Sequence, residues 1–224
     1  MTRQLRLRFR RQVSFARSDF VAGPSNAQAL AAVDAWPAWH GGCLALFGPE
    51  GCGKTHLARI WADRAKAVIL DRTDLQPDAA VGRPALVEDV DQGCDAEALF
   101  HLINMAGHDG GGLLLTARAA PATWPAVLPD LRSRLNAMPV AEIAAPDDEV
   151  LEGVLRKFFR ERSIRSPQDI FPYLLRRMER SAPAAREIVK RLDEVAGEEQ
   201  RPISRALARQ ILDGDADNLD LFEG

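Results

Sequence analysis

The segment of residues 48–55 constrains the fold of this chain more than any other part of its sequence. It reads Gly-Pro-Glu-Gly-Cys-Gly-Lys-Thr and matches the phosphate-binding pattern Gly-x-x-x-x-Gly-Lys-Ser/Thr. The apolar residues 43–47 before it are typical of a buried strand, and residues 55–65 after it carry apolar side chains at helical spacing. A chance glycine-rich turn is the alternative, but it would not require this strand–loop–helix context. The sequence therefore predicts a loop that binds a nucleotide.

The residue types of this loop suit the phosphates of a nucleotide. Glycines let successive backbone N–H groups turn toward one point, and the N-terminus of the following helix adds its dipole. Lys54 supplies a cation for the β- and γ-phosphates, and the Thr55 hydroxyl is a ligand for Mg²⁺. The candidate nucleotide contacts in this segment are Gly48, Gly51, Cys52, Gly53, Lys54, Thr55 and His56.

Charge, cysteine content and hydropathy exclude several classes of protein. A formal net charge of −3 argues against non-specific DNA binding by the protein as a whole. Three cysteines without a Cys-x-x-Cys pair, and four histidines without metal-ligand spacing, argue against a zinc site or a disulfide framework. No apolar run approaches the length of a membrane span. We therefore expect a reduced, cytoplasmic protein without a membrane partner.

Apolar strands alternate with helices over residues 20–145, and this pattern predicts an α/β domain with a parallel sheet covered on both faces. The expected strands are residues 43–47, 67–71, 84–89, 113–117 and 138–143. The expected helices are residues 27–36, 55–65, 95–107 and 122–135.

The pattern changes at residues 146–148, beyond which the sequence indicates helices alone. Residues 146–213 therefore form a predicted small all-α domain, and residues 214–224 a flexible acidic tail. Its expected helices are residues 148–162, 168–180, 183–196 and 203–212.

Two carboxylates, Glu88 and Asp89, end the third expected strand, as the second half of a phosphate-loop site requires. One of them orients Mg²⁺, generally through water, and its neighbour polarises the water that attacks the γ-phosphate. Thr116 ends the next strand and can hold that water or the γ-phosphate. Ordinary surface acids are the alternative. We predict Thr55 and Glu88 as metal residues, and Asp89 and Thr116 as catalytic residues.

Two arginines outside the loop are further candidates. Arg134 lies just before the fifth expected strand and can reach a nucleotide held by a neighbouring subunit, where such a residue is worth about 10³–10⁵ in rate. Its alternative role is a solvated cation at a helix C-terminus. Arg186 begins the third helix of the small domain and can swing onto the phosphates when that domain closes. Its alternative is a plain position on a helix face.

The first residues alternate with a period of two, which places Leu5, Leu7 and Phe9 on one face of an extended segment. Such a segment is either an edge strand of the domain or a short peptide that docks its apolar side chains in the groove of another protein. Residues 218–222 have a similar apolar spacing.

Taken together, these residues resemble the DnaA branch of the AAA+ ATPases, and most closely its Hda (HdaA) regulatory proteins. Residues 20–26, Phe-Val-Ala-Gly-Pro-Ser-Asn, are similar to the DnaA motif Phe-Val-x-Gly-x-Ser-Asn; residues 48–55 match Walker A and residues 86–89 Walker B. Thr116 falls at sensor 1, Arg134 at the arginine finger and Arg186 at sensor 2. The resemblance implies a RecA-like AAA+ core over residues 20–145 and a helical lid over residues 146–213. The sequence ends where DnaA continues into its helix-turn-helix domain, and this favours Hda over an initiator.

The resemblance also implies partners and a function. Residues 4–9 resemble the clamp-binding consensus Gln-Leu-x-Leu-x-Leu/Phe through Gln4, Leu5, Leu7 and Phe9, so that residues 1–19 are a clamp-binding peptide and linker. Residues 219–222 are a second candidate. Such a protein holds ADP or ATP with Mg²⁺, binds the sliding clamp of DNA polymerase, and touches DNA through the clamp. It stimulates hydrolysis of DnaA-bound ATP and so represses re-initiation of chromosome replication. A nucleoid-associated cytoplasmic location and a homo-oligomer are compatible with this function.

One departure concerns the chain's own hydrolysis. Glu88 stands where DnaA relatives usually have aspartate, and Asp89 follows where many AAA+ proteins have glutamate. The longer Glu88 side chain changes the Mg²⁺ geometry, so we expect weak intrinsic ATPase activity. The alternative function is a stand-alone AAA+ ATPase of the helicase-loader type, which requires appreciable turnover by the isolated chain. A small-molecule kinase leaves the helical domain and both peptide-like ends unexplained.

Overall fold

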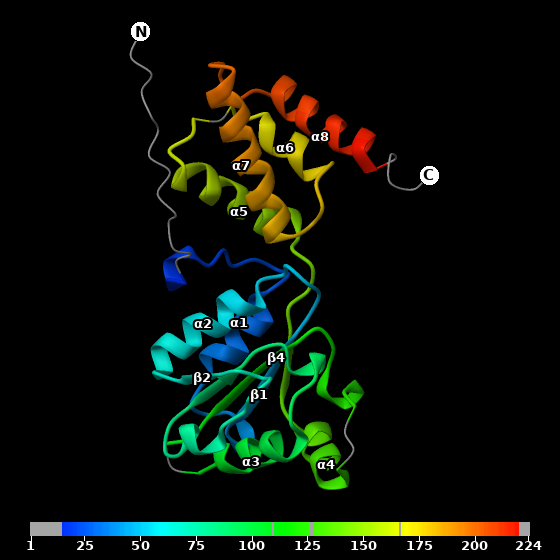
Figure 1. Ribbon diagram of the computed structural model, residues 1–224. Helices are drawn as coiled ribbons and strands as arrows, with labels where there is room; N and C mark the ends of the chain where they lie inside the picture. Colours follow the sequence, from blue (N-terminus) through cyan, green and yellow to red (C-terminus); the bar gives the residue numbers. More distant parts are fainter. Residues whose placement is uncertain (1–14, 109, 126–127, 166, 220–224) are drawn as a thin grey trace.

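The computed structural model describes residues 15–108, 110–125, 128–165 and 167–219 of the 224-residue chain. They form an α/β domain and a smaller domain of helices above it (Figure 1). The predicted peptide contacts Gln4, Leu5, Leu7 and Phe9 lie outside the described residues, as do residues 220–224. In the part of the chain that is described, no helix is long and apolar enough to cross a membrane.

The α/β domain is built on a five-stranded sheet in the order β2-β3-β4-β1-β5, and all four pairings are parallel. The strands are β1 (Cys43–Phe47), β2 (Val68–Leu70), β3 (Ala85–Val87), β4 (Leu113–Ala117) and β5 (Val140–Glu142). β4 lies in the middle, and its residues Leu113, Leu114 and Leu115 are at most 1% exposed. Such continuous apolar runs form these strands because both faces of the sheet are covered.

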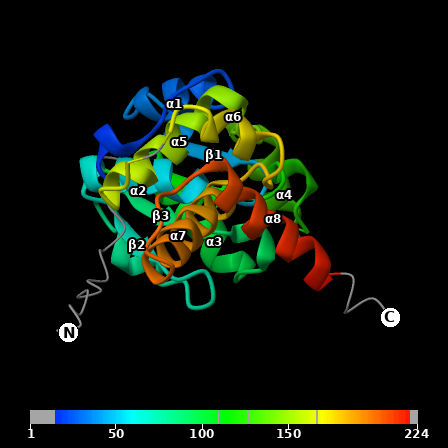
Figure 2. The ribbon, with the colours of Figure 1, turned by 90° about the horizontal axis from the view of Figure 1, so that it is seen from above.

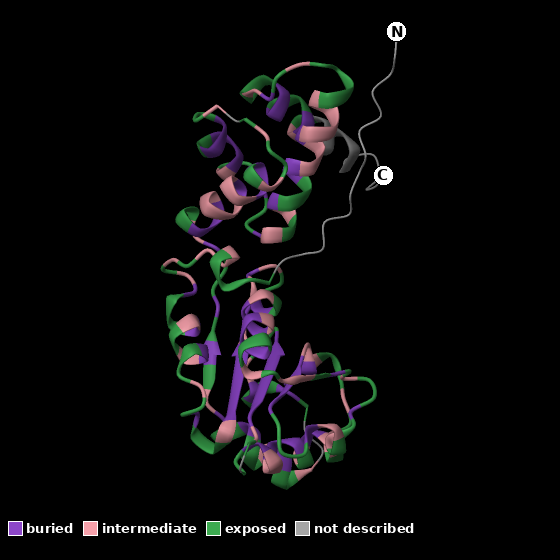
Figure 3. Ribbon diagram, turned by 90° about the vertical axis from the view of Figure 1, so that its left-hand side faces the viewer, coloured by how far each residue is buried: buried purple, intermediate pink, exposed green. Residues whose placement is uncertain are grey.

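Helices cover the two faces, and Figure 3 shows the buried sheet between them. α1 (Ala27–Asp34) and α2 (Lys54–Ala65) pack on one face, whereas α3 (Ala96–Ala106) and α4 (Pro129–Ala137) pack on the other. Because side chains alternate along a strand, Leu44 and Leu46 lie in the core with α1 and α2, and Cys43 and Ala45 lie with α3 and α4.

The helical domain has a core of its own, and Figure 2, seen from above, shows its helices in front of the α/β domain. Its helices are α5 (Asp148–Glu161), α6 (Ile170–Leu175), α7 (Ala182–Glu198) and α8 (Arg205–Leu219). Asp147 caps α5 by accepting the N–H of Val150 at 2.8 Å, and Ser181 caps α7 by accepting that of Ala184 at 3.2 Å. The short 3₁₀ helices are η1 (Arg17–Asp19), η2 (His40–Gly42), η3 (Pro77–Ala80), η4 (Val90–Gln92) and η5 (Pro121–Thr123).

The predicted parallel sheet and helical domain are confirmed, and three element boundaries are corrected. The helix expected at residues 122–135 begins only at Pro129, because Pro125 and Pro129 disfavour helical backbone at the residue before each of them. The helix expected at residues 168–180 is only α6, and a turn follows in which Arg180 donates to the carbonyl oxygen of Pro146 at 2.9 Å. The tail expected from residue 214 is helical as far as Leu219.

Candidate nucleotide site

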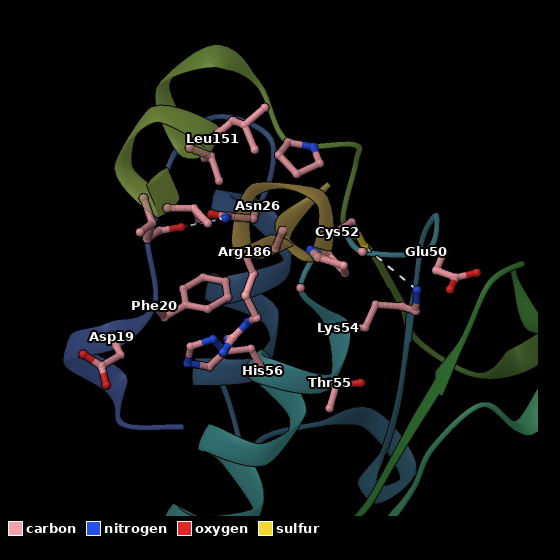
Figure 4. A pocket seen from close by; sticks show the side chains of 18 of the residues that line it. Asp19, Phe20, Asn26, Glu50, Cys52, Lys54, Thr55, His56, Leu151 and Arg186 are labelled. Carbon is pink, nitrogen blue, oxygen red and sulfur yellow. Dashed lines mark hydrogen bonds between the residues drawn. The ribbon is translucent and has the colours of Figure 1, made fainter. Parts of the chain in front are cut away.

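A pocket of about 560 Å³ lies between the two domains, at the carboxyl ends of the parallel strands (Figure 4). This edge of a parallel sheet is where α/β proteins bind ligands, and the volume suits a nucleotide. The phosphate-binding loop and the start of α2 form one wall of the pocket. The residues that line it from other elements include Phe15, Phe20, Asp89, Arg118, Leu151 and Arg186.

Glycines give the loop its shape. Gly48 has a φ of 154°, and a Cβ atom there would lie 2.0 Å from the carbonyl oxygen of Ile143. Gly53, with a φ of 109°, is the N-cap of α2. The loop thus brings the N-terminus of α2 to the pocket, where the free N–H groups of a helix N-terminus can bind an anion.

The loop is also attached to the helical domain. The N–H of Ala182, at the start of α7, donates to the carbonyl oxygen of Gly51 at 3.1 Å. Gly51 has a φ of 73°, and a Cβ atom there would lie only 2.7 Å from the Cβ of Ser181. The first turn of α7 thus rests directly on the loop.

Lys54 is buried beside this loop. Its Nζ donates to the carbonyl oxygens of Gly48 at 2.7 Å and Pro49 at 2.8 Å, and lies 4.0 Å from the Sγ of Cys52. Nucleotide phosphates would offer this ammonium group stronger, charge-assisted hydrogen bonds than the two carbonyls do. Burial raises the pKa of the Cys52 thiol, the charge of Lys54 lowering it by less, and Cys52 therefore stays a neutral packing residue.

His56 lies at the aromatic end of the pocket (Figure 4). Phe15 and Phe20 approach its ring edge-on, at centroid distances of 5.6 and 5.5 Å. Burial lowers the pKa of His56, and the positive charge of Lys157 lowers it further. Its Nε2 is buried without a hydrogen-bond partner among the described residues. A neutral imidazole among phenyl rings suits the base of a nucleotide better than its phosphates.

Arg186 lines the pocket together with the phosphate-binding loop. It lies one turn into α7, and its guanidinium carbon is 4.6 Å from the ring centroid of Phe158. Both side chains line the pocket, and Figure 4 shows Arg186 extending toward His56. The contact of α7 with Gly51 fixes the distance between this arginine and the loop.

The two carboxylates after β3 are placed differently. Asp89 lines the pocket, whereas Glu88 does not. The Oε2 of Glu88 accepts hydrogen bonds from the Nε of Arg59, at 2.9 Å, and from its Nη2. The Oε1 of Glu88 is buried without a partner among the described residues.

Thr116 is joined to this strand end and buried. Its Oγ1 accepts the backbone N–H of Asp89 at 3.0 Å, and Thr116 is 1% exposed and does not line the pocket. In this arrangement Thr116 orients the Asp89 backbone.

The predicted Mg²⁺ residues fit the ion unequally. Thr55 and Asp89 line the pocket and offer the hydroxyl and carboxylate oxygens that Mg²⁺ prefers. Glu88 does not fit in the same way, because Arg59 already holds one of its oxygens. Within the described ranges, no group of three or more His, Cys, Asp or Glu side chains could hold a metal ion. An ion in this pocket would therefore depend mainly on the phosphates.

Arg134 lies outside the pocket, in the last turn of α4, and is exposed. No hydrogen bond or ion pair joins its side chain to the described residues. The neighbouring Arg132 is used internally, since its guanidinium donates to the carbonyl oxygens of Ala122, at 2.9 Å, and Trp124. Of these two arginines, only Arg134 is available to another molecule.

One pocket residue, Arg118, and one residue outside the pocket lining, Arg59, were not singled out from the sequence. Arg118, directly after β4, pairs with Glu50 of the loop at 3.0 Å, and its backbone N–H donates to the Oδ2 of Asp91 at 2.8 Å. Both Arg118 and Glu50 line the pocket. Arg59, behind Glu88, was detectable in principle, because it lies four residues after Thr55 on the same face of α2.

Comparisons with known proteins point to DnaA. The chain is 27% identical over 229 residues to the chromosomal replication initiator protein DnaA of Thermomicrobium roseum, an alignment that covers 88% of this chain and 49% of that protein. It spans about half the length of the full DnaA proteins that it matches. No protein-family model matches the chain.

Solved structures agree in fold. Domain III of Thermotoga maritima DnaA superimposes with a TM-score of 0.73 at 18% identity, covering 89% of this chain and 96% of that one. AMPPCP-bound DnaA from Aquifex aeolicus gives a TM-score of 0.68 at 19% identity, covering 83% and 66%. The RuvB branch migration motor of T. maritima gives 0.68 at 15% identity, covering 88% and 70%. The chain is thus a DnaA-related protein with an AAA+ fold.

Proposed function

We propose that this chain is a nucleotide-binding regulator of the Hda type, which stimulates hydrolysis of ATP bound to DnaA and so represses re-initiation of replication. The similarity to DnaA and the pocket around residues 48–55 support this proposal. Bound to the sliding clamp, the protein would act in the cytoplasm near the nucleoid and reach DNA through the clamp.

In this proposal ADP or ATP occupies the chain's own pocket. The loop N–H groups and Lys54 bind the phosphates, Arg186 approaches them from the helical domain, and the base lies near Phe20 and His56. When bound, Mg²⁺ neutralises phosphate charge, and Thr55 with Asp89 would hold it. AMPPCP in the related A. aeolicus DnaA supports an adenine nucleotide here. The nucleotide would tie the two domains together through α7.

The single observation that carries the proposed reaction is the exposed Arg134, without a partner among the described residues, beside the internally bonded Arg132. An arginine offered to a neighbour's nucleotide stabilises the charge that develops on the transferred phosphate. The neighbour in this proposal is DnaA, and a second copy of the chain can meet the same residue in a homo-oligomer.

The test measures hydrolysis of DnaA-bound ATP with clamp-loaded DNA and this protein present. Arg134→Ala should lower the stimulation by about 10²-fold or more, since a finger arginine is worth about 10³–10⁵ in rate. Arg160→Ala is the matched control, because Arg160 is also an exposed arginine in the last turn of a helix. Equal stimulation by Arg134→Ala and wild type would rule out this role.

Clamp attachment rests on the sequence resemblance at Gln4, Leu5, Leu7 and Phe9. Gln4→Ala combined with Leu5→Ala should abolish binding to immobilised clamp, because the apolar side chains and the amide dock together. Arg6→Ala is the control, because the sequence alternation places Arg6 opposite Leu5, Leu7 and Phe9 if the segment is extended. If the double variant binds the clamp as well as the wild type does, residues 219–222 become the candidate for clamp binding.

A further inference from the structure

The carboxylate of Glu88, which was expected to orient Mg²⁺, is paired with Arg59 instead. Arg59 lies one helical turn after Thr55, and its Nε and Nη2 both donate to the Oε2 of Glu88. The pair is largely withdrawn from solvent, with side-chain exposures of 33% for Arg59 and 17% for Glu88. The guanidinium therefore neutralises the carboxylate of Glu88, the residue directly before Asp89, which lines the pocket.

This arrangement competes with a divalent ion. Mg²⁺ requires near-octahedral oxygen ligands and is held by one or two carboxylates together with phosphates and water. To reach the ion or its water, Glu88 would have to leave Arg59, and the guanidinium would then stand unpaired near a dication. Glu88 is also absent from the lining of the pocket, whereas Thr55 and Asp89 belong to it.

We infer that Arg59 substitutes for Mg²⁺ in neutralising Glu88, so that the chain binds nucleotide with little dependence on Mg²⁺ and keeps Glu88 out of a hydrolytic arrangement. Arg59 is a positioning residue, because it acts through Glu88. The inference rests on the proposed binding of nucleotide and adds how its metal requirement is set.

Removing the guanidinium of Arg59 tests whether it takes the place of Mg²⁺ beside Glu88. In Arg59→Gln, Glu88 keeps its charge but loses its cation, and a close charge partner is commonly worth 1–3 pK units, or about tenfold or more in an equilibrium. Nucleotide phosphates should then bind at least about tenfold more weakly without Mg²⁺ (~1.4 kcal/mol), and Mg²⁺ should restore the affinity. The double variant Arg59→Gln, Glu88→Gln removes both charges and should return to the wild-type behaviour.

The experiment measures the affinity of the full chain for fluorescent N-methylanthraniloyl-ADP, in excess Mg²⁺ and in EDTA. The ratio compared is the dissociation constant in EDTA divided by that in Mg²⁺. It should stay below about threefold for the wild type and exceed about tenfold for Arg59→Gln. Arg64→Gln, which removes an exposed arginine of the same helix, should behave as wild type. Thermal unfolding of each variant shows whether it is folded.

The outcomes separate this inference from the proposed function. No binding of the nucleotide by the wild-type chain under either condition would remove the proposed function itself. Binding that weakens about tenfold or more in EDTA for wild type, or equal ratios for wild type and Arg59→Gln, would overturn the inference alone. If Arg59→Gln does not fold, the wild-type ratio and that of the double variant still decide.

Discussion

Replacing Gly51 by alanine should separate the phosphate-binding loop from the helix that carries Arg186. A Cβ atom at Gly51 would lie 2.7 Å from the Cβ of Ser181 and 3.0 Å from the Cδ of Pro183. Both neighbours belong to the start of α7, so the helix must move away. The hydrogen bond from the N–H of Ala182 to the carbonyl oxygen of Gly51 would then be lost.

A second glycine isolates the backbone part of this effect. Gly82 has a φ of 68°, close to the 73° of Gly51, but a Cβ atom there would have no neighbour within 4 Å. Left-handed backbone costs an alanine about 1–2 kcal/mol, and the reduced freedom of the unfolded chain offsets about 0.4–1 kcal/mol of it. Gly82→Ala should therefore lower the free energy of unfolding by about 1 kcal/mol.

Gly51→Ala adds the lost contact to this backbone cost. A hydrogen bond contributes about 0.5–1.5 kcal/mol, and the displaced helix loses packing as well. The total loss in unfolding free energy should be about 2–3 kcal/mol. Affinity for ADP should also fall, because Arg186 moves with α7, whereas Gly82→Ala should bind ADP as wild type does.

Urea denaturation of the two variants, with the slope held common, gives the difference in unfolding free energy. Titration with fluorescent ADP gives the affinities. If Gly51→Ala is no less stable than Gly82→Ala and binds ADP as tightly as wild type, the contact between the loop and α7 does not link the domains.

Two further predictions concern two side chains of the pocket, the titratable His56 and the charged Arg118. Because burial, and then the charge of Lys157, lowers the pKa of His56, the unfolded chain binds more protons than the folded one. The contribution of neutral His56 to the free energy of unfolding should be fully present above the unfolded pKa of about 6.5. It should fall as the pH decreases below that value. Urea denaturation at several pH values should show that the free energy of unfolding falls less with decreasing pH in His56→Gln than in the wild type. Equal falls in the two proteins would show that His56 does not cause this pH dependence. Arg118→Ala breaks an exposed ion pair with Glu50 and should change stability by less than about 1 kcal/mol. It should nevertheless lower affinity for ATP more than for ADP in competition titrations, and an unchanged ratio would exclude contact with the terminal phosphate.

Local sequence signals predicted the parts of the fold that local physics determines. β1 and β4 begin and end at the expected residues, because each is an apolar run followed or preceded by glycine. The late start of α4 was missed because the helical spacing of residues 122–135 outweighed the prolines within it. The helix propensities of residues 213–219 did not predict that α8 continues to Leu219. In the fold, Asp213 pairs with Arg209 one turn earlier and with Arg177 after α6.

The site divides in the same way. The phosphate-binding loop and Arg186 were expected and line one pocket, since a motif and its strand–helix context define them. Phe15, Arg118 and Arg59 were not singled out, because their roles depend on contacts with residues at least 27 positions away in the sequence. Glu88 shows the limit most clearly. Its position after β3 predicted a metal role, and the spacing of Arg59 after Thr55 did not show that Arg59 pairs with Glu88, 29 residues further along the chain.

The distribution of charge is consistent with the proposal that this chain acts on the nucleotide of a partner. Two carboxylates beside the chain's own loop are already paired with cations, Glu88 with Arg59 and Glu50 with Arg118. Such pairing lowers the electrostatic contribution that either carboxylate can make to a metal or to an attacking water. Arg134 is exposed and has no side-chain partner among the described residues. An unpaired guanidinium contributes most where negative charge develops in a water-poor site, and the nucleotide of a bound partner supplies such a site. If the isolated chain hydrolysed ATP as fast as DnaA does in its presence, Glu88 and Asp89 would have to act in the chain's own pocket, and this distribution of charge would lose its functional meaning.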